Sequence, residues 1–265
     1  SQHVGDLTHA LAHERFTRTL ADLGRLFDVT PEWVAVDLHP LYLSRRHGLQ
    51  EAGRNGPGPY DRDPRGACDR ESTESLPPAA LHVIEVQHHH AHLASLMAEH
   101  GRTERTVGLV CDGVGYGTDD AAWGGEVLVG DLERFERAGH LRPLRLPGGD
   151  VAARRIGRCA LSWMVDALGP DAAAAHPLTR RVLPDDAERR AVLAMLDADL
   201  YCPPSSGLGR LFDAAASLLG LCDHNHHEAM SGQLLEAAAS RSDARPGGDG
   251  CIPIAPPAGA APFTM

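Results

Sequence analysis

Four histidines stand close together directly after a short apolar segment. The run is Gln87-His88-His89-His90-Ala91-His92, and on a helix His88 and His92 share one face because they lie one turn apart. Two imidazoles at this spacing can hold one divalent metal ion, as in the H-E-x-x-H metalloproteases. No Glu follows the first histidine here, so the base of that protease chemistry is missing. The run predicts a metal site; the competing interpretation is a polar helix start with incidental histidines.

An aspartate followed by alternating glycines comes after the next apolar segment. Residues 106–111 read as a strand that runs into Asp112-Gly113-Val114-Gly115-Tyr116-Gly117. Glycines let a backbone approach phosphates closely, and an aspartate at a strand end can bind a metal or orient a water molecule. Asp-Gly is also the usual signal of a hairpin turn. The residues alone leave a ligand-binding loop and a hairpin turn equally open.

A third candidate segment is Ser205-Ser206-Gly207-Leu208-Gly209-Arg210-Leu211-Phe212-Asp213. Ser205 or Ser206 would cap a helix whose N-terminus favours anions, and Asp213 could accept hydrogen bonds from ribose hydroxyls. An ordinary capped helix is the favoured interpretation from the residues alone. Two other motifs have plain interpretations, a tight turn and a solvated loop: Leu146-Pro147-Gly148-Gly149-Asp150, and the histidines His224, His226 and His227.

Composition narrows the possible classes of protein. The 265 residues suffice for one large domain or two coupled lobes, and 43% hydrophobic residues allow a sizeable core. The formal net charge of -11 argues against tight non-specific binding to nucleic acid, which needs a basic face. All 25 basic side chains are arginines, which excludes both a Schiff-base lysine and a Walker-type phosphate lysine.

Several features predict a cytoplasmic protein. The six cysteines form no CxxC pair, so neither a disulfide framework nor a zinc finger is expected. No segment approaches about 18 consecutive apolar residues, so no membrane span is expected. The start Ser1-Gln2-His3 does not resemble a signal peptide. The missing initiator methionine leads us to expect a fragment or a processed chain.

The elements that must position these residues follow an order typical of an α/β domain with a mixed sheet. Apolar periodicity predicts one domain over residues 1–240 with a surface-loop insertion at 53–80, followed by a loose Pro/Gly/Ala-rich tail at 241–265. The predicted strands are 33–38, 81–86, 106–111, 122–129 and 135–146, and the predicted helices are 6–27, 88–100, 150–168, 186–198, 207–220 and 227–240.

Taken together, the ordered motifs resemble the HypF family of hydrogenase maturation proteins. The resemblance covers about residues 1–52 and 81–238. It is carried by Ser1-Gln2-His3-Val4-Gly5-Asp6-Leu7, Asp37-Leu38-His39-Pro40, the histidine run, the Asp112–Gly117 segment, Trp123-Gly124-Gly125-Glu126, Gly139-His140-Leu141, the Leu146–Asp150 turn and the Gly209–Ala214 segment.

The resemblance implies a carbamoyltransferase with an ASKHA (actin-like ATPase, ribonuclease H-like) fold, a mixed sheet with flanking helices and an incomplete second lobe. Such proteins make carbamoyl adenylate from carbamoyl phosphate and ATP. They then pass the carbamoyl group to the C-terminal cysteine of a partner, HypE, in [NiFe]-hydrogenase maturation. The nucleophile is then the partner's thiol, which agrees with the lack of an evident serine or cysteine nucleophile in this chain.

Carried over position by position, the resemblance makes His88, His92 and Asp112 metal ligands, with Fe²⁺ or Zn²⁺ as suitable ions. It places Gly113, Gly115 and Gly117 along the phosphate or carbamoyl site, and Gly209 and Asp213 near the nucleotide ribose. A divalent metal that polarises the carbamoyl oxygen or neutralises the adenylate phosphate would lower the barrier by several kcal/mol.

The chain departs from the family pattern in several places. Three features of the family have no counterpart here: the N-terminal domains, the zinc-finger cysteine pairs and the later N-D-G-G stretch. In the family, that stretch supplies a fourth metal ligand, an aspartate. A glycine that usually follows Glu228 is Ala229, which is expected to crowd the nucleotide. We therefore expect weak or no transfer by the isolated chain. Two alternatives stay open: a small-molecule O-carbamoyltransferase, and a non-catalytic metal- or partner-binding fragment.

Overall fold

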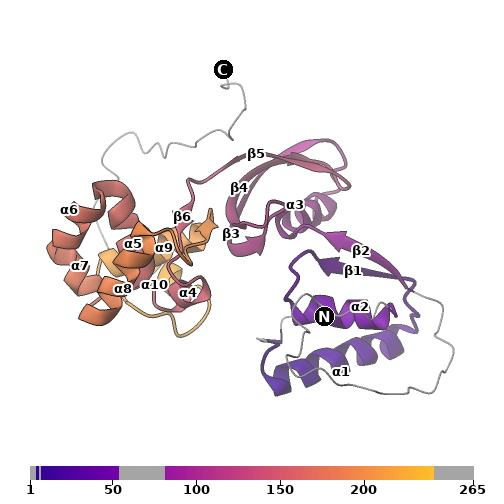
Figure 1. Cartoon of the computed structure of the whole chain (residues 1–265). Coiled ribbons are helices and arrows are strands. Elements are labelled where there is room, and N and C mark those ends of the chain that lie inside the picture. Colours follow the sequence, from indigo (N-terminus) through magenta and orange to yellow (C-terminus); the bar gives the residue numbers. More distant parts are fainter. Residues whose placement is uncertain (1–3, 6, 54–80, 242–265) are drawn as a thin grey trace. The chain divides into compact units, whose positions relative to one another are not determined.

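The computed structural model describes residues 4–5, 7–53 and 81–241, and the chain divides into two compact units, residues 1–87 and 88–265 (Figure 1). The predicted insertion at 53–80 and the predicted tail at 241–265 lie outside the described residues, apart from Gly53 and Arg241. The predicted mixed α/β architecture is confirmed, since each unit combines strands with helices.

The first unit contains two parallel strands and two helices. Its elements are α1 (Ala10–Phe27), β1 (Trp33–Asp37), α2 (Leu43–Glu51) and β2 (His82–Val86). Strands β1 and β2 pair in register from Trp33 opposite His82 to Asp37 opposite Val86. Helix α2 packs on β1 at Gly48, where a Cβ atom would come within 2.6 Å of Val36. Parallel pairing requires a long crossover, which here includes α2.

The sheet of the second unit is built around an antiparallel meander. Its strands are β3 (Thr106–Tyr116), β4 (Ala122–Gly130), β5 (Phe135–His140), β6 (Leu144–Arg145) and β7 (Pro204–Ser205). Strand β4 lies between β3 and β5, and its start also pairs with β7 in parallel. The sheet is therefore mixed, as predicted.

Strand β3 is longer than the sequence predicts. The predicted strand ended at Cys111 and continued as a glycine-rich turn, but β3 extends to Tyr116 with a bulge between Cys111 and Gly115. The prediction that Asp112 ends a strand is therefore wrong, and so is the hairpin turn at Asp112-Gly113. The bulge explains both errors, because an unpaired insertion in a strand uses the same glycines that mark a turn.

Helix α3 (His88–Glu99) covers one face of β3 and β4. Leu93 and Met97 of the helix pack with Val110 of β3 and with Trp123 and Leu128 of β4 in one buried cluster. The helix can approach closely at Gly108, where a Cβ atom would stand 2.6 Å from a methyl group of Leu93. This packing determines which residues of β3 face the start of α3.

The remainder of the second unit is mainly helical. Its helices are α4 (Asp150–Arg154), α5 (Gly157–Leu168), α6 (Pro170–Ala175), α7 (Pro177–Val182), α8 (Asp186–Asp197), α9 (Leu208–Leu218) and α10 (Met230–Ser240). A buried cluster joins α5 to α8, with Leu161, Val182 and Val192 almost inaccessible to solvent. None of the helices that the structure describes has the length and apolar character of a membrane span.

Sequence predictions for this region need correction at four points. The predicted helix 150–168 is two helices, α4 and α5, and the predicted strand 135–146 is two strands, β5 and β6. Helices α6 and α7 were not predicted, although each begins with a proline, which suits the first helical position. Neither Ser205 nor Ser206 caps α9, whose N-cap is Gly207.

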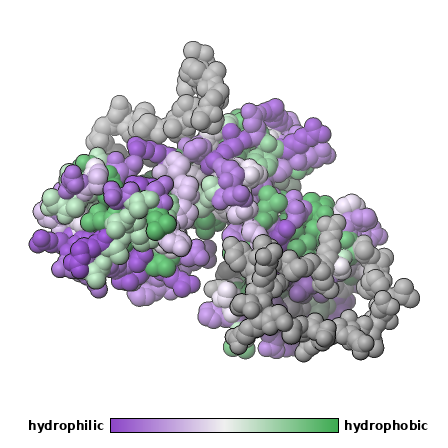
Figure 2. All heavy atoms as spheres, in the orientation of Figure 1, coloured by the Kyte–Doolittle hydropathy of each residue, from purple (hydrophilic) through white to green (hydrophobic). Residues whose placement is uncertain are grey.

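Hydrophobic side chains also occur at the surface of the molecule, among hydrophilic ones (Figure 2). On β3, alternate residues Val107 and Leu109 are 69% and 72% exposed. The intervening positions face α3, so the alternation follows directly from the two-residue period of a strand.

Candidate metal centre

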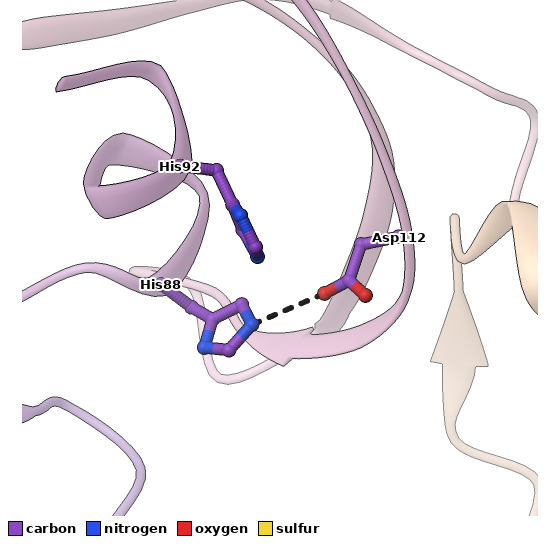
Figure 3. Close-up of side chains that lie close together, drawn as sticks. All are labelled: His88, His92 and Asp112. Atoms are coloured by element: carbon purple, nitrogen blue, oxygen red, sulfur yellow. Dashed lines mark ion pairs between the residues drawn. The ribbon is translucent and has the colours of Figure 1, made fainter. Parts of the chain in front are cut away.

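Three predicted ligands lie together where the start of α3 faces the bulge of β3. Side chains of His88 and His92 project from one face of the helix toward Asp112 (Figure 3). Nε2 of His88 is 3.2 Å from Oδ2 of Asp112, and one ligand atom from each of the three residues lies within 4.8 Å of the others. The structure thus brings the predicted set together, and two elements supply it.

Two neighbouring residues, His89 and Gly115, lie against this triad. Nε2 of His89, a fully buried ring, is 3.5 Å from the same Asp112 oxygen. Gly115 lies against the rings of His88 and His89, because its Cβ atom would stand 2.6 Å from a carbon of each. The predicted phosphate-binding role of Gly115 stays a prediction, but the packing gives an independent reason for glycine at this position.

Electrostatics favour the ligand forms of these side chains. Burial alone would raise the pKa of Asp112, but hydrogen bonds from His88, His89 and the Gly113 N–H outweigh it and hold the pKa far below its usual range. Partial burial, and then the charge of His88, lower the pKa of His92. A charged carboxylate and a neutral imidazole are the forms that coordinate metals.

The donor set fits a divalent transition metal. Imidazole nitrogens and a carboxylate oxygen suit Zn²⁺ or Fe²⁺, whereas Mg²⁺ and Ca²⁺ prefer oxygen ligands alone. Within the described part of the chain, this triad is the group of three or more potential ligands whose donor atoms converge. His224, His226 and His227 are all exposed, as a solvated loop requires.

The predicted glycines fall into two places. Gly209, in the first turn of α9, packs directly on Gly113, since a Cβ atom on Gly209 would be 2.8 Å from the Gly113 Cα. Gly117 lies instead beyond the bulge, directly after the last residue of β3, where its N–H donates to the carbonyl of Ala121 and Trp123 fills the space beside it. Of these three glycines, Gly113 and Gly209 are therefore the pair beside Asp112.

Asp213 lies on α9 and is almost completely buried, with 1% of its side chain exposed. One carboxylate oxygen accepts hydrogen bonds from Asn225 and Ser231, and the other is paired with Arg210. The predicted ribose contact of Asp213 stays a prediction. Its observed partners are side chains of α9, of α10 and of the segment between them.

Sequence reasoning missed an ionic network around a buried glutamate of β4. Glu126, in the middle of β4 and 0% exposed, accepts hydrogen bonds from Arg137, Ser206 and the N–H groups of Gly124 and Gly125. Arg137 also lies 4.0 Å from the centre of the Trp123 ring. A lone glutamate inside the otherwise uncharged strand 122–130 was the available signal.

The network has a positional consequence. Burial would raise the pKa of Glu126, but hydrogen bonds from Arg137 and Ser206 lower it, so the carboxylate stays charged. Through Ser206 it holds the start of α9 against the sheet. Gly124 lies at this contact. A Cβ atom added to it would collide with both the Asp112 carbonyl and the Gly207 Cα. The network thus supports the contact between β4 and the start of α9 beside Asp112.

Comparisons with known proteins agree with this geometry. Residues 1–99 match the HypF Kae1-like domain, and residues 108–252 match the second subdomain of the carbamoyltransferase Kae1-like domain. Carbamoyltransferase HypF2 of Cupriavidus necator is 39% identical over 244 residues, which is 90% of this chain and 26% of that protein. Carbamoyltransferase HypF of Rhodobacter capsulatus is 37% identical over 242 residues, or 90% of this chain and 29% of that protein.

Two solved structures show the same fold. Full-length HypF in a phosphate- and nucleotide-bound form is 35% identical with a TM-score of 0.70, covering 89% of this chain and 32% of that one. T. kodakarensis HypF is 27% identical with a TM-score of 0.75, covering 92% and 30%. Fold and sequence thus define a Kae1-like domain of the ASKHA type. Within that class, the chain belongs to the HypF carbamoyltransferase family, and it spans about a quarter to a third of the relatives it matches.

Proposed function

We propose that this chain carries the metal- and nucleotide-binding part of an enzyme that transfers a carbamoyl group from carbamoyl adenylate to the C-terminal cysteine thiol of a HypE-like protein. The observation that carries the proposal is the convergence of His88, His92 and Asp112 on one point, next to the contact between Gly113 and Gly209. Family membership supports the reaction class, and the donor set supports a divalent metal.

In the proposed transfer, the thiolate sulfur of the partner attacks the carbamoyl carbon of the adenylate. A carbon–sulfur bond forms, and the bond between that carbon and the phosphate oxygen breaks. AMP leaves with the bonding electrons, and the thiol proton is given to solvent. The acceptor sulfur of the proposed transfer belongs to the partner. Within this chain, Cys159 is a poor nucleophile, because burial and then Asp213 raise its pKa to about 12.

A bound divalent metal would supply positive charge that polarises the carbamoyl oxygen or neutralises the phosphate. His88, His92 and Asp112 would hold that ion. His89 and the Gly113 N–H orient the Asp112 carboxylate, so it is preorganised for this role. The buried Glu126 network keeps the start of α9 beside these ligands. Each of these tasks is binding or positioning.

Metal content provides the direct test. The purified chain, dialysed against Zn²⁺ or Fe²⁺ under anaerobic conditions, should bind one ion per chain, measured by elemental analysis. His88→Ala and Asp112→Asn should weaken binding by about 100-fold or more, because each removes one of three protein ligands. His226→Ala removes an exposed histidine outside the triad and is the matched control.

Two results would contradict the proposal. One is wild-type affinity in both triad variants. The other is an equal loss in His226→Ala, which would indicate non-specific histidine binding. The transfer step is tested by incubating a longer HypF chain that contains this segment with carbamoyl phosphate, ATP and a HypE C-terminal peptide. Mass spectrometry should detect a carbamoylated cysteine, and the His88→Ala change should abolish it.

A further inference from the structure

Arg210 occupies an unusual place in the first turn of α9. Its Nη1 atom is 2.7 Å from Oδ2 of Asp213, and 14% of its side chain is exposed. A cation in the first turn of a helix faces the positive end of the helix dipole, which is unfavourable without compensation. The carboxylate of Asp213, one turn further along, supplies that compensation.

Asp213 is itself fixed from its other side. Its Oδ1 atom accepts hydrogen bonds from Nδ2 of Asn225 at 2.7 Å and from the hydroxyl of Ser231 at 2.5 Å. With both oxygens engaged and the side chain 1% exposed, the carboxylate has little freedom to rotate. The guanidinium paired with it is therefore held in one orientation.

That orientation directs one nitrogen toward the bulge of β3. A Cβ atom added to Gly113 would have Nη2 of Arg210 as its nearest neighbour, at 3.9 Å. The space between Gly113 and this nitrogen can therefore hold one more carbon-sized atom without a clash. Gly113 follows Asp112 directly. The guanidinium thus faces the space beside the metal triad with a nitrogen that Asp213 does not use.

We propose that Arg210 binds a phosphate oxygen of the nucleotide and that Asp213 is the positioning residue that holds it there. The inference rests on the proposed function, because a nucleotide beside the metal triad is what would bring a phosphate to this position. A guanidinium held by a buried carboxylate presents preorganised donors to a phosphate, and its hydrogen bonds are charge-assisted. The competing interpretation is an ion pair that only stabilises α9.

The test compares two ligands that differ in phosphate alone. ATP and adenosine are titrated calorimetrically into the metal-loaded chain, for the wild type and for Arg210→Gln, Arg210→Lys and Asp213→Asn. Arg210→Gln should weaken ATP binding by about 10-fold or more and leave adenosine binding unchanged. Arg210→Lys should lose less, because it keeps the charge. Arg105→Gln removes an exposed arginine and is the control for net charge.

Each outcome decides the question. Three results would overturn the inference. They are an equal loss of ATP and adenosine binding in Arg210→Gln, unchanged ATP binding in that variant, and no ATP binding by the wild type. Weaker adenosine binding in Asp213→Asn would overturn the positioning role and favour a direct ribose contact. Metal content, measured on the same samples, separately decides the proposed function, so the two failures are distinguishable. A melting temperature within a few degrees of the wild type shows that a variant is folded.

Discussion

Nε2 of His88 lies 3.2 Å from Oδ2 of Asp112, although one residue starts a helix and the other lies in the bulge of a strand. The close approach depends on the packing of α3 on β3, where glycines replace side chains at the contact. The predictions below change either this relationship or the elements that maintain it.

Substituting Gly115 should damage the metal centre without touching a ligand. In Gly115→Ala, the new Cβ atom would stand 2.6 Å from ring carbons of His88 and His89, so both imidazoles must move. We expect metal affinity to fall by about 10- to 100-fold, as for other changes that misplace ligands. Gly113→Ala is the matched control, since its Cβ atom meets nothing closer than 3.9 Å. Equal metal affinities in the two variants would contradict this account.

Metal should stabilise the folded chain through the triad. An ion that binds only the folded state adds about 2.7 kcal/mol to the free energy of unfolding at 100 times its dissociation constant. Urea unfolding with and without Zn²⁺ should show this increase in the wild type and lose it in Asp112→Asn. A chelator should reverse the increase. The same increase in Asp112→Asn would show that zinc acts elsewhere.

The buried Glu126 should contribute to stability in a pH-dependent way. Its pKa in the folded state is lowered, so its contribution is fully present above the pKa of the unfolded chain and is lost as the pH falls through the folded pKa. Glu126→Gln should lower the free energy of unfolding at pH 7 by about 2–3 kcal/mol, because it weakens the ion pair between the fully buried Glu126 and the partly exposed Arg137.

The same comparison at acidic pH provides the check. The difference between wild type and Glu126→Gln should narrow as the pH drops below the usual carboxyl range. Glu99→Gln, at an exposed position on α3, should change stability little at either pH. A difference that stays constant from pH 7 into the acid range would show that the charge of Glu126 is not what matters.

Ala229 should be replaceable by glycine with a gain in stability. It is the N-cap of α10 and has φ 59 and ψ 12, a left-handed conformation that is unfavourable for a residue with a Cβ atom. Ala229→Gly should raise the free energy of unfolding by about 0.5–1 kcal/mol. Ala238→Gly, within the same helix, should lower it by about 1 kcal/mol. Destabilisation by Ala229→Gly would mean that the left-handed conformation is not retained in solution.

Sequence reasoning identified the three proposed ligands because their spacing is local or their motif is distinctive. His88 and His92 are one helical turn apart, and a helix places such residues on one face whatever surrounds it. The positions of β1 and β2 and the extent of α3 were also predictable, since short apolar runs mark the strands and Gly101 marks the end of the helix. The bulge in β3 was not, because glycines within a strand and glycines in a turn look alike in a sequence.

By itself, then, the sequence indicated the family, the alternation of strands and helices, and the residues that we propose as metal ligands. Tertiary structure alone decided that Asp112 reaches the histidines and that Gly113 meets Gly209. The physical reason is how far apart along the chain the interacting residues lie. Helical spacing and strand alternation act over a few residues, whereas these contacts join elements far apart in the chain and depend on how closely the backbones pack.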